Sequence, residues 1–222
     1  MERFLVGDVA NLNKGECKLS LILNKNAGIQ DDVVFSNQDY YLNVVLNAGN
    51  KLIDCEAAFQ IYDREFREKE VSLEYVEDES LVSIQGPRAK DIISALIGEK
   101  LDNMLFMTSQ KFPVKKFNTE IMVSRCGYTG EDGFELSIKD DVIEKVCEFL
   151  FDEFPDVLTA SGLGARDLLR LEAGMNLHGH DISEDINPME ALLLWTVRKK
   201  NKFAPFVGSK RLKEIRKVNN LT

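Results

Sequence analysis

The stretch Arg125-Cys-Gly-Tyr-Thr-Gly-Glu-Asp-Gly-Phe-Glu-Leu136 joins two apolar runs, residues 120–125 and 133–138, that are typical of β-strands. Its three glycines lie within seven residues and permit an unusual turn or a close approach of the backbone to a ligand. Glu135 lies in the second apolar run, and a buried carboxylate requires a partner or a ligand. The stretch therefore predicts either a glycine-rich hairpin with an acid at the strand edge, or a binding site in which Tyr128 offers a stacking ring.

Outward from this stretch, strands and helices alternate along the chain with short turns between them. Short apolar runs predict strands, and apolar residues at every third or fourth position predict helices. Further strands are expected at residues 18–23, 32–36, 40–46, 71–76, 80–85 and 112–117. Helices are expected at residues 50–70, 87–97 and 140–154, and another begins at residues 187–188. These elements indicate an α+β fold with largely antiparallel sheets and flanking helices.

The chain is expected to divide near Asp78, where the pattern of elements renews after a short acidic run. The expected parts are a first α+β subdomain at residues 1–77, a second at residues 78–170, and a helical return segment with a basic tail at residues 171–222. Within the first part, the helix at residues 50–70 is expected to bury an apolar face that includes Leu52 and Phe59.

Composition and charge limit the classes of function. The chain has 222 residues, 44% of them hydrophobic, which suffices for a sizeable core. No run approaches the roughly 18 apolar residues that span a membrane, and the first ten residues read as neither a signal nor a transit peptide. Residues 198–222 carry a charge of +8, so residues 1–197 sum to −17. This acidic body argues against nucleic acid as the main ligand, and the basic tail is expected to be solvated or to dock an acidic partner.

Cysteine and histidine usage argues against a metal site. None of the four cysteines forms a C-x-x-C pair, so all four are expected to be reduced, partly buried thiols. The cysteines are Cys17, Cys55, Cys126 and Cys147. His178 and His180 are the only histidines, and no cysteine pair lies near them in the sequence.

Two adjacent carboxylates, Asp31 and Asp32, follow a turn at residues 24–30. Neighbouring residues of a strand point to opposite faces, so one aspartate is expected to face a pocket and the other solvent. The alternative interpretation is ordinary turn chemistry, because aspartate is common where a turn leads into a strand.

Arg166 and Arg170 are expected on one face of a helix that follows Gly162 and Gly164. The third glycine of a dinucleotide loop and the Lys-Ser/Thr of a phosphate loop are both absent. The planar guanidinium suits a carboxylate or the edge of a flat heterocycle, while the alternative is a salt-bridged helix. Farther along, the only tryptophan, Trp195, ends an apolar run and by itself favours a core position.

Three motifs, in this order, resemble the aminomethyltransferase family, the T-proteins of the glycine cleavage system. They are R-C-G-Y-T-G-E-D-G-F-E from Arg125, G-L-G-A-R-D-L-L-R-L-E-A-G-M-N-L-H-G-H-D-I from Gly162, and N-P-M-E-A-L-L-L-W-T-V from Asn187. The motifs L-V-G-D-V from Leu5, N-K-N-A-G-I-Q-D-D from Asn24, V-V-L-N-A-G from Val44 and F-V-G-S-K-R-L from Phe206 agree with it. The resemblance therefore runs from Leu5 to about Leu212.

The resemblance implies a folate-binding fold of two intertwined subdomains and a transferase activity. In the family reaction, tetrahydrofolate takes the methylene carbon of an aminomethyl group carried on the lipoyl arm of the H-protein, and ammonia leaves. No metal is implied. The motif R-C-G-Y-T-G is common in mitochondrial members, so the mitochondrial matrix is the expected location, or the cytoplasm for a bacterial protein.

The resemblance also assigns site residues. Asp32 is expected to be the catalytic carboxylate that stabilises the iminium-like carbon. Tyr128 and Glu135 are expected at the pterin, and Arg166 at the glutamate carboxylate of the folate. Asn47 and Trp195 fall at further pocket positions of the family. The hypothesis expects Asp32, Glu135 and Arg166 around a common cavity.

The chain departs from the family pattern in places, and other interpretations remain open. The usual Gly-Gly before the two aspartates is Ala27-Gly28, and the family's N-terminal segment and C-terminal β-barrel are expected to be missing. One alternative is a non-enzymatic folate-binding relative that assists iron–sulfur assembly; such proteins carry K-G-C-Y-x-G, and Asp32 argues against it. Others are the folate domain of a dimethylglycine or sarcosine demethylase, and a purely structural module.

Overall fold

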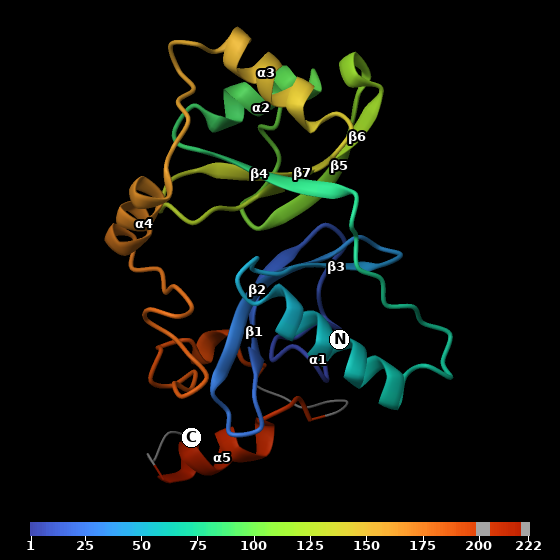
Figure 1. The fold of residues 1–222 in the computed structure, drawn as a ribbon, viewed down its shortest axis with the longest axis vertical. Coiled ribbons are helices and arrows are strands. Elements are labelled where there is room, and N and C mark those ends of the chain that lie inside the picture. Colours follow the sequence, from blue (N-terminus) through green and yellow to red (C-terminus); the bar gives the residue numbers. More distant parts are fainter. Residues whose placement is uncertain (199–204, 219–222) are drawn as a thin grey trace. The chain divides into compact units, whose positions relative to one another are not determined.

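The computed structural model describes residues 1–198 and 205–218, which form two compact units (Figure 1). The first unit combines Met1–Lys14 and Lys18–Tyr75 with the described part of Asn176–Thr222. The second unit contains Gly15–Cys17 and Val76–Met175. The chain thus leaves the first unit, builds the second, and returns to complete the first.

A three-stranded sheet forms the centre of the first unit. Its strands, in the order β1-β2-β3, are β1 (Cys17–Leu23), β2 (Ile29–Asn37) and β3 (Leu42–Val45). β2 and β3, near the strands expected at residues 32–36 and 40–46, pair as an antiparallel hairpin. Buried and half-buried residues alternate over most of β2, and the inward side chains Val33 and Phe35 enter a core that also includes Phe4, Leu5 and Ile22.

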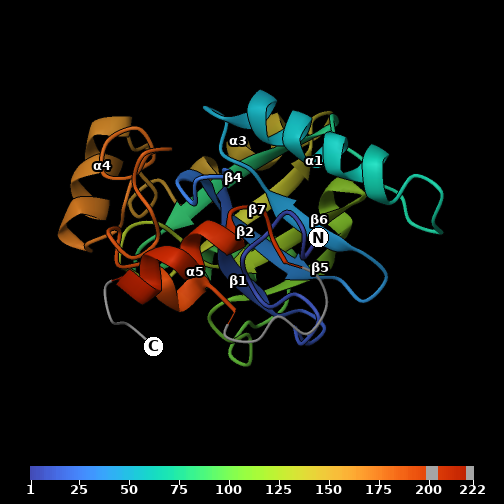
Figure 2. The ribbon, with the colours of Figure 1, turned by 90° about the horizontal axis from the view of Figure 1, so that it is seen from below.

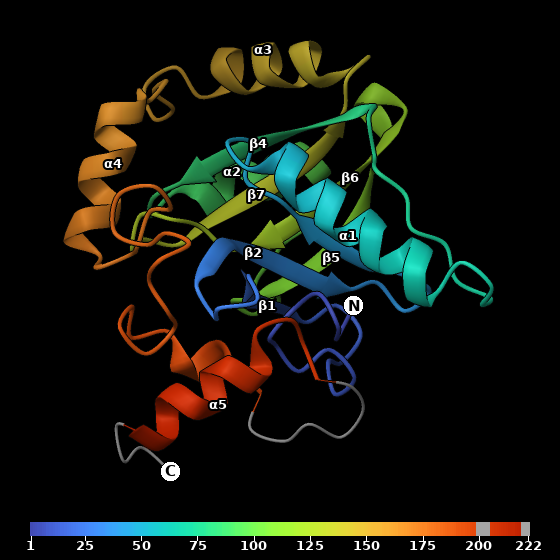
Figure 3. The same cartoon turned by 60° about the horizontal axis from the view of Figure 1, so that its bottom comes forward.

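Helix α1 (Lys51–Glu65) runs beside β2 and β3 (Figure 3). The prediction that its apolar face is buried was wrong, because Leu52 is 79% exposed and Phe59 is also exposed. The helix instead packs against the core through its alanines and Ile61, and its fully buried residue is Asp54. The strand expected at residues 71–76 was also wrong, since this segment is an exposed connection.

The described part of the segment that returns to the first unit, from Asn176 onward, packs near the turn between β1 and β2. Helix α5 (Ser209–Val218) lies near the start of β2 and the end of β1, where Leu212 joins a core with Leu21 and Ala27 (Figure 2). The segment before α5 carries Arg198, which is buried, so this member of the basic tail is not solvated. Lys199, Lys200 and Lys202 lie outside the described residues.

The prediction of a helix that begins at residues 187–188 was wrong. The start signals are present, because Asn187 Oδ1 accepts the N–H of Met189 at 2.9 Å and Glu190 Oε2 accepts the N–H of Asn187 at 2.9 Å. Leu192, however, has a φ of 58°, a left-handed conformation that ends helical hydrogen bonding. Turns and the short 3-10 helix η2 (Leu194–Thr196) follow instead.

A four-stranded antiparallel sheet forms the second unit, with α2 and α3 together on one face (Figure 1). Its strands, in the order β4-β7-β6-β5, are β4 (Glu79–Gln85), β7 (Gly133–Lys139), β6 (Thr119–Arg125) and β5 (Thr108–Val114). The helices are α2 (Ala89–Ile97), α3 (Ile143–Glu153) and α4 (Leu163–Glu172), and η1 (Lys115–Phe117) is a 3-10 turn between β5 and β6.

The core of this unit lies between the sheet and the two helices. Ile93 of α2 and Val146 of α3 are fully buried against Phe134, Leu136 and Ile138 of β7. Gly98 ends α2 with a φ of 73°, as the glycine after the expected helix indicated. The expected α+β fold with largely antiparallel sheets is confirmed. Within the described residues, no helix combines the length and apolar character needed to cross a membrane.

Candidate functional site

The turn between β1 and β2 sets the start of the strand that carries both aspartates. Asn24 braces this turn, because its Oδ1 accepts the N–H groups of Asn26 and Gly28 at 2.9 and 3.0 Å. Ala27 has a φ of 69°, in the left-handed region where a side chain is disfavoured. Glycine adopts this conformation without strain, so it would fit position 27 better than the alanine that stands there in place of the expected glycine.

Asp31 and Asp32 both lie inside β2, and neither is simply exposed to solvent. Asp31 is 0% exposed and Asp32 is half-buried. The expected alternation of faces holds, but the carboxyl of Asp54 on α1 lies against Asp31. The expectation that one aspartate faces solvent was therefore wrong, because a helix packs over that face of the strand.

Asn47 fixes the backbone between the two aspartates. Its Nδ2 donates to Asp31 Oδ1 at 3.0 Å and to the backbone oxygen of Asp32 at 2.7 Å. The N–H of Asp32 also donates to Asp31 Oδ1, at 3.0 Å. The structure thus brings together two of the residues named from the resemblance, Asn47 and Asp32.

The surroundings of Asp32 favour a carboxyl that titrates near neutral pH. Burial raises the pKa of Asp32 to about 6, the negative charge of Asp31 adds to the rise, and His178 opposes it. His178 is held by Asn50, whose Nδ2 lies 3.0 Å from its Nδ1, and its Nε2 lies 3.2 Å from the backbone oxygen of Ile29. A carboxylate of this pKa can stabilise a cation or exchange protons.

Sequence reasoning missed three residues of this site, His178, Asn50 and Asp54. The histidine was considered only as a metal ligand, and its distance along the chain from β2 gave no sign that it lies at that strand. Asp54 lies outside the apolar face that the sequence predicted for α1, so no local pattern marked it as a buried residue.

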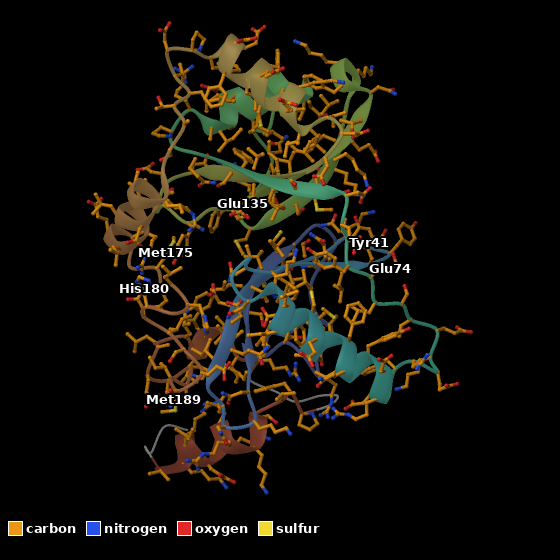
Figure 4. All side chains as sticks on the ribbon, viewed as in Figure 1. Tyr41, Glu74, Glu135, Met175, His180 and Met189 are labelled. Carbon is orange, nitrogen blue, oxygen red and sulfur yellow. The ribbon has the colours of Figure 1, made fainter. Side chains whose placement is uncertain are left out.

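The second unit contains a pocket of about 590 Å³ between β4 and the segment that leads into α4. Tyr128, Glu135 and Arg166 all line it, so three residues named from the resemblance meet there. Asp32 belongs to the first unit and is not among the lining residues, so the common cavity expected for Asp32, Glu135 and Arg166 stays a prediction. The guanidinium of Arg166 lies over the ring of Tyr128, 4.6 Å from its centroid. Figure 4 shows Glu135 on the four-stranded sheet of this unit.

Two glycines of the stretch that joins β6 to β7 make room for a side chain. A Cβ added at Gly127 or Gly133 would lie 1.9 or 2.0 Å from Gln85 Oε1. The Nε2 of Gln85 donates to the backbone oxygens of Cys126 and Phe134 at 3.2 and 3.3 Å. These two glycines therefore serve the packing of Gln85, while Tyr128 and Glu135 of the same stretch face the pocket.

The ends of this stretch are braced by an ion pair. The Nε and Nη2 of Arg125 bind the two carboxylate oxygens of Asp132 at 2.9 and 2.8 Å. The Arg125 guanidinium holds the pKa of Asp132 below its usual value. Gly130 between them has a φ of 79°, so the expected glycine-rich turn is present.

The two arginines of helix α4 differ in burial and in their partners. Arg170 is buried, and its Nε binds Asp167 Oδ1 at 2.8 Å while Nη1 donates to the backbone oxygen of Met175 at 3.0 Å. Arg166 is exposed and lies over Tyr128. The salt-bridged interpretation therefore fits Arg170, and Arg166 remains directed at the pocket.

Trp195 occupies the short helix η2 in the first unit and is 70% exposed. The core position favoured by its apolar context was therefore wrong, because the left-handed Leu192 turns the chain before it. An exposed tryptophan ring is a common binding surface, since it combines a large apolar area with a polar edge. Its assignment to the folate pocket stays a prediction.

All four cysteines are free thiols, as expected. Burial raises the pKa of Cys17 to about 12 and also raises that of Cys126. Both thiols are therefore poor nucleophiles. Among residues 1–198 and 205–218, no group of three or more His, Cys, Asp or Glu side chains is arranged to hold a metal ion.

Comparisons with known proteins agree with this fold. The model of the GCVT N-terminal domain matches residues 1–201. The mitochondrial aminomethyltransferase of Canis lupus familiaris is 42% identical over 207 residues, which are 92% of this chain and 50% of that protein. The human mitochondrial aminomethyltransferase is 40% identical over 214 residues, 95% of this chain and 52% of that protein.

A solved structure shows the same fold. The glycine cleavage system aminomethyltransferase T from Bartonella henselae is 34% identical, with a TM-score of 0.80 over 96% of this chain and 56% of that chain. The chain spans about half the length of the curated relatives that it matches. On the match to the domain model and on these identities, the chain belongs to the aminomethyltransferase family of the glycine cleavage system, whose GCVT N-terminal domain it carries.

Proposed function

We propose that this chain provides the folate-binding and catalytic residues of a tetrahydrofolate-dependent aminomethyltransferase. The reaction would move the methylene carbon of an aminomethyl group from a lipoyl carrier, the H-protein, to tetrahydrofolate and release ammonia. The observation that carries the proposal is the pocket lined by Tyr128, Glu135 and Arg166, since each offers one of the contacts that a folate requires.

The pocket fits a folate in size and chemistry. Its volume of about 590 Å³ is within the range of about 300–1,000 Å³ found for small-molecule sites. Glu135 can accept hydrogen bonds from the amine and ring N–H groups of the pterin. Arg166 can bind the glutamate carboxylate with two parallel hydrogen bonds, and Tyr128 can stack on a flat ring.

Asp32 supplies the charge that the transfer step needs. Breaking the bond between carbon and the departing nitrogen or sulfur group places positive charge on the methylene carbon. A carboxylate stabilises this charge, and with a pKa of about 6 Asp32 is mostly ionised at neutral pH. Asn47 holds the strand backbone beside it, so the carboxylate is positioned before the reaction begins.

Binding of tetrahydrofolate tests the proposal. Glu135→Gln keeps the shape of the side chain but removes its charge and one acceptor, so we expect the dissociation constant measured by calorimetry to rise about 10- to 100-fold. The control is Glu120→Gln on the exposed face of β6 in the same sheet, which should leave the affinity unchanged. Equal affinities for wild type and Glu135→Gln would exclude the proposed role of this pocket.

The partner and the location follow from the same proposal. A lipoyl carrier protein is the expected partner, because the aminomethyl group is delivered on its arm. We propose the mitochondrial matrix as the location, and the names of the relatives support this since they are mitochondrial aminomethyltransferases. A co-sedimentation or calorimetric titration with aminomethyl-loaded H-protein would measure the partner contact directly.

A further inference from the structure

Two carboxyl groups, Asp31 on β2 and Asp54 on α1, are both 0% exposed. One oxygen of each is satisfied by an amide: Asp54 Oδ1 accepts Gln30 Nε2 at 2.8 Å, and Asp31 Oδ1 accepts Asn47 Nδ2 at 3.0 Å. The other oxygen of each, Oδ2, is buried and has no hydrogen-bond donor in the described part of the chain. Buried carboxylate oxygens without donors are costly, so two in one place require an explanation.

The two carboxyls act on each other directly. The pKa of Asp54 is raised to about 7, first by burial and then by hydrogen bonding to the carboxyl of Asp31. Two ionised carboxylates in contact repel each other strongly when they are buried. One proton between them replaces this repulsion with a strong hydrogen bond and satisfies both orphan oxygens.

We propose that Asp31 and Asp54 share one proton between their Oδ2 atoms, and that this acid pair positions Asp32. The second half of this statement rests on the catalytic role proposed for Asp32. The pair then carries one negative charge instead of two beside Asp32. Asp31 remains free to accept the N–H of Asp32 with Oδ1, so the strand backbone at Asp32 is held by the proton-sharing pair.

Other ionisable groups surround the pair. Asp32 adds negative charge from β2, and His178 faces Asp32 on the first unit. On α1, burial raises the pKa of the Cys55 thiol, the charge of Asp54 adds to the rise, and Lys51 opposes it. The shared proton of the pair and the carboxyl of Asp32 are therefore the two groups expected to titrate between about pH 6 and pH 7.

Isosteric substitutions test the shared proton. In Asp54→Asn, the new amide Nδ2 replaces the shared proton by donating to Asp31 Oδ2. In Asp31→Asn, the new amide donates in the opposite direction, to Asp54 Oδ2. Each single variant should therefore fold with a denaturation midpoint close to that of wild type at pH 7. The double variant places two amide donors against each other. Its denaturation midpoint should therefore drop by much more than the sum of the drops in the two single variants.

The pH dependence distinguishes proton sharing from mere packing. The native state keeps a proton that the unfolded chain releases above its ordinary carboxyl pKa, so wild-type stability should fall as pH rises from about 4 to about 7 and should level off above that pH. Asp54→Asn should remove most of this fall, leaving the smaller part that belongs to Asp32. The control Asp63→Asn, on the exposed face of α1, should keep the wild-type slope.

Three outcomes would overturn the proposal. They are a wild-type slope retained in Asp54→Asn, additive effects in the double variant, and a wild-type midpoint that falls when a chelator removes divalent cations, which would indicate a bridging cation. The positioning role has its own readout: each single asparagine variant keeps one negative charge in the pair, so the Asp32 carboxyl, followed by carbon NMR, should titrate near its wild-type pH in both, and a clear shift in both would contradict the role. These measurements need no turnover, so they remain decisive even if tetrahydrofolate fails to bind and the proposed function is wrong.

Discussion

Replacing Asp32 by asparagine is expected to lower the rate of aminomethyl transfer by about 10²- to 10⁴-fold. Asparagine keeps the size of the side chain but cannot carry the charge that stabilises the methylene cation. The measurement is the release of ammonia with aminomethyl-loaded lipoyl carrier and tetrahydrofolate, together with a calorimetric titration of tetrahydrofolate. Binding should change only a few-fold, because Glu135 and Arg166 are intact.

The same carboxyl predicts the pH profile. Its pKa is raised to about 6, so Asp32 is protonated below that pH and ionised above it. Wild-type transfer should therefore fall as pH drops through about 6, and Asp32→Asn should lack this limb. A wild-type chain that binds tetrahydrofolate but transfers nothing would favour the non-enzymatic folate-binding alternative, and an unchanged rate in Asp32→Asn would exclude its catalytic role.

Replacing Gly28 by alanine is expected to lower the free energy of unfolding by about 3 kcal/mol or more. The added Cβ would lie 1.6 Å from the backbone oxygen of Glu184 and 2.5 Å from its carbonyl carbon. Backbone atoms cannot move aside as a side-chain tip can, so the turn and the returning segment must separate. Their hydrogen bond from Asn24 Nδ2 to Glu184 O, at 2.9 Å, would be lost. Urea denaturation at constant pH measures the change.

Gly164→Ala is the matched control for this substitution. Gly164 lies in α4, and an added Cβ meets nothing within 4 Å. Alanine there should stabilise the protein by about 0.5–1 kcal/mol, because it restricts the unfolded chain and favours the helix. If Gly28→Ala were as well tolerated as Gly164→Ala, the close packing of the β1–β2 turn against Glu184 would be wrong.

Local sequence patterns predicted the elements whose structure depends on residues close together in the sequence. The strands that pair as β2–β3 and β5–β6, helix α2 with Gly98 at its end, and helix α3 all lie near the ranges that local patterns predicted. The patterns failed where distant contacts decide. The apolar residues of α1 face outward because the helix docks through small alanines, and Leu192 stops the helix that Asn187 begins.

Sequence by itself determined the class of fold, the family, and the residue types that a folate site needs, because periodicity, turn residues and long motifs are local properties of the chain. Only the tertiary structure decided which carboxylates are buried. Asp54 lies 23 positions after Asp31, and the docking of α1 on β2 leaves two of their oxygens without donors. Burial and proximity set the charge of an acid, and neither exists until the helix and the strand have packed together.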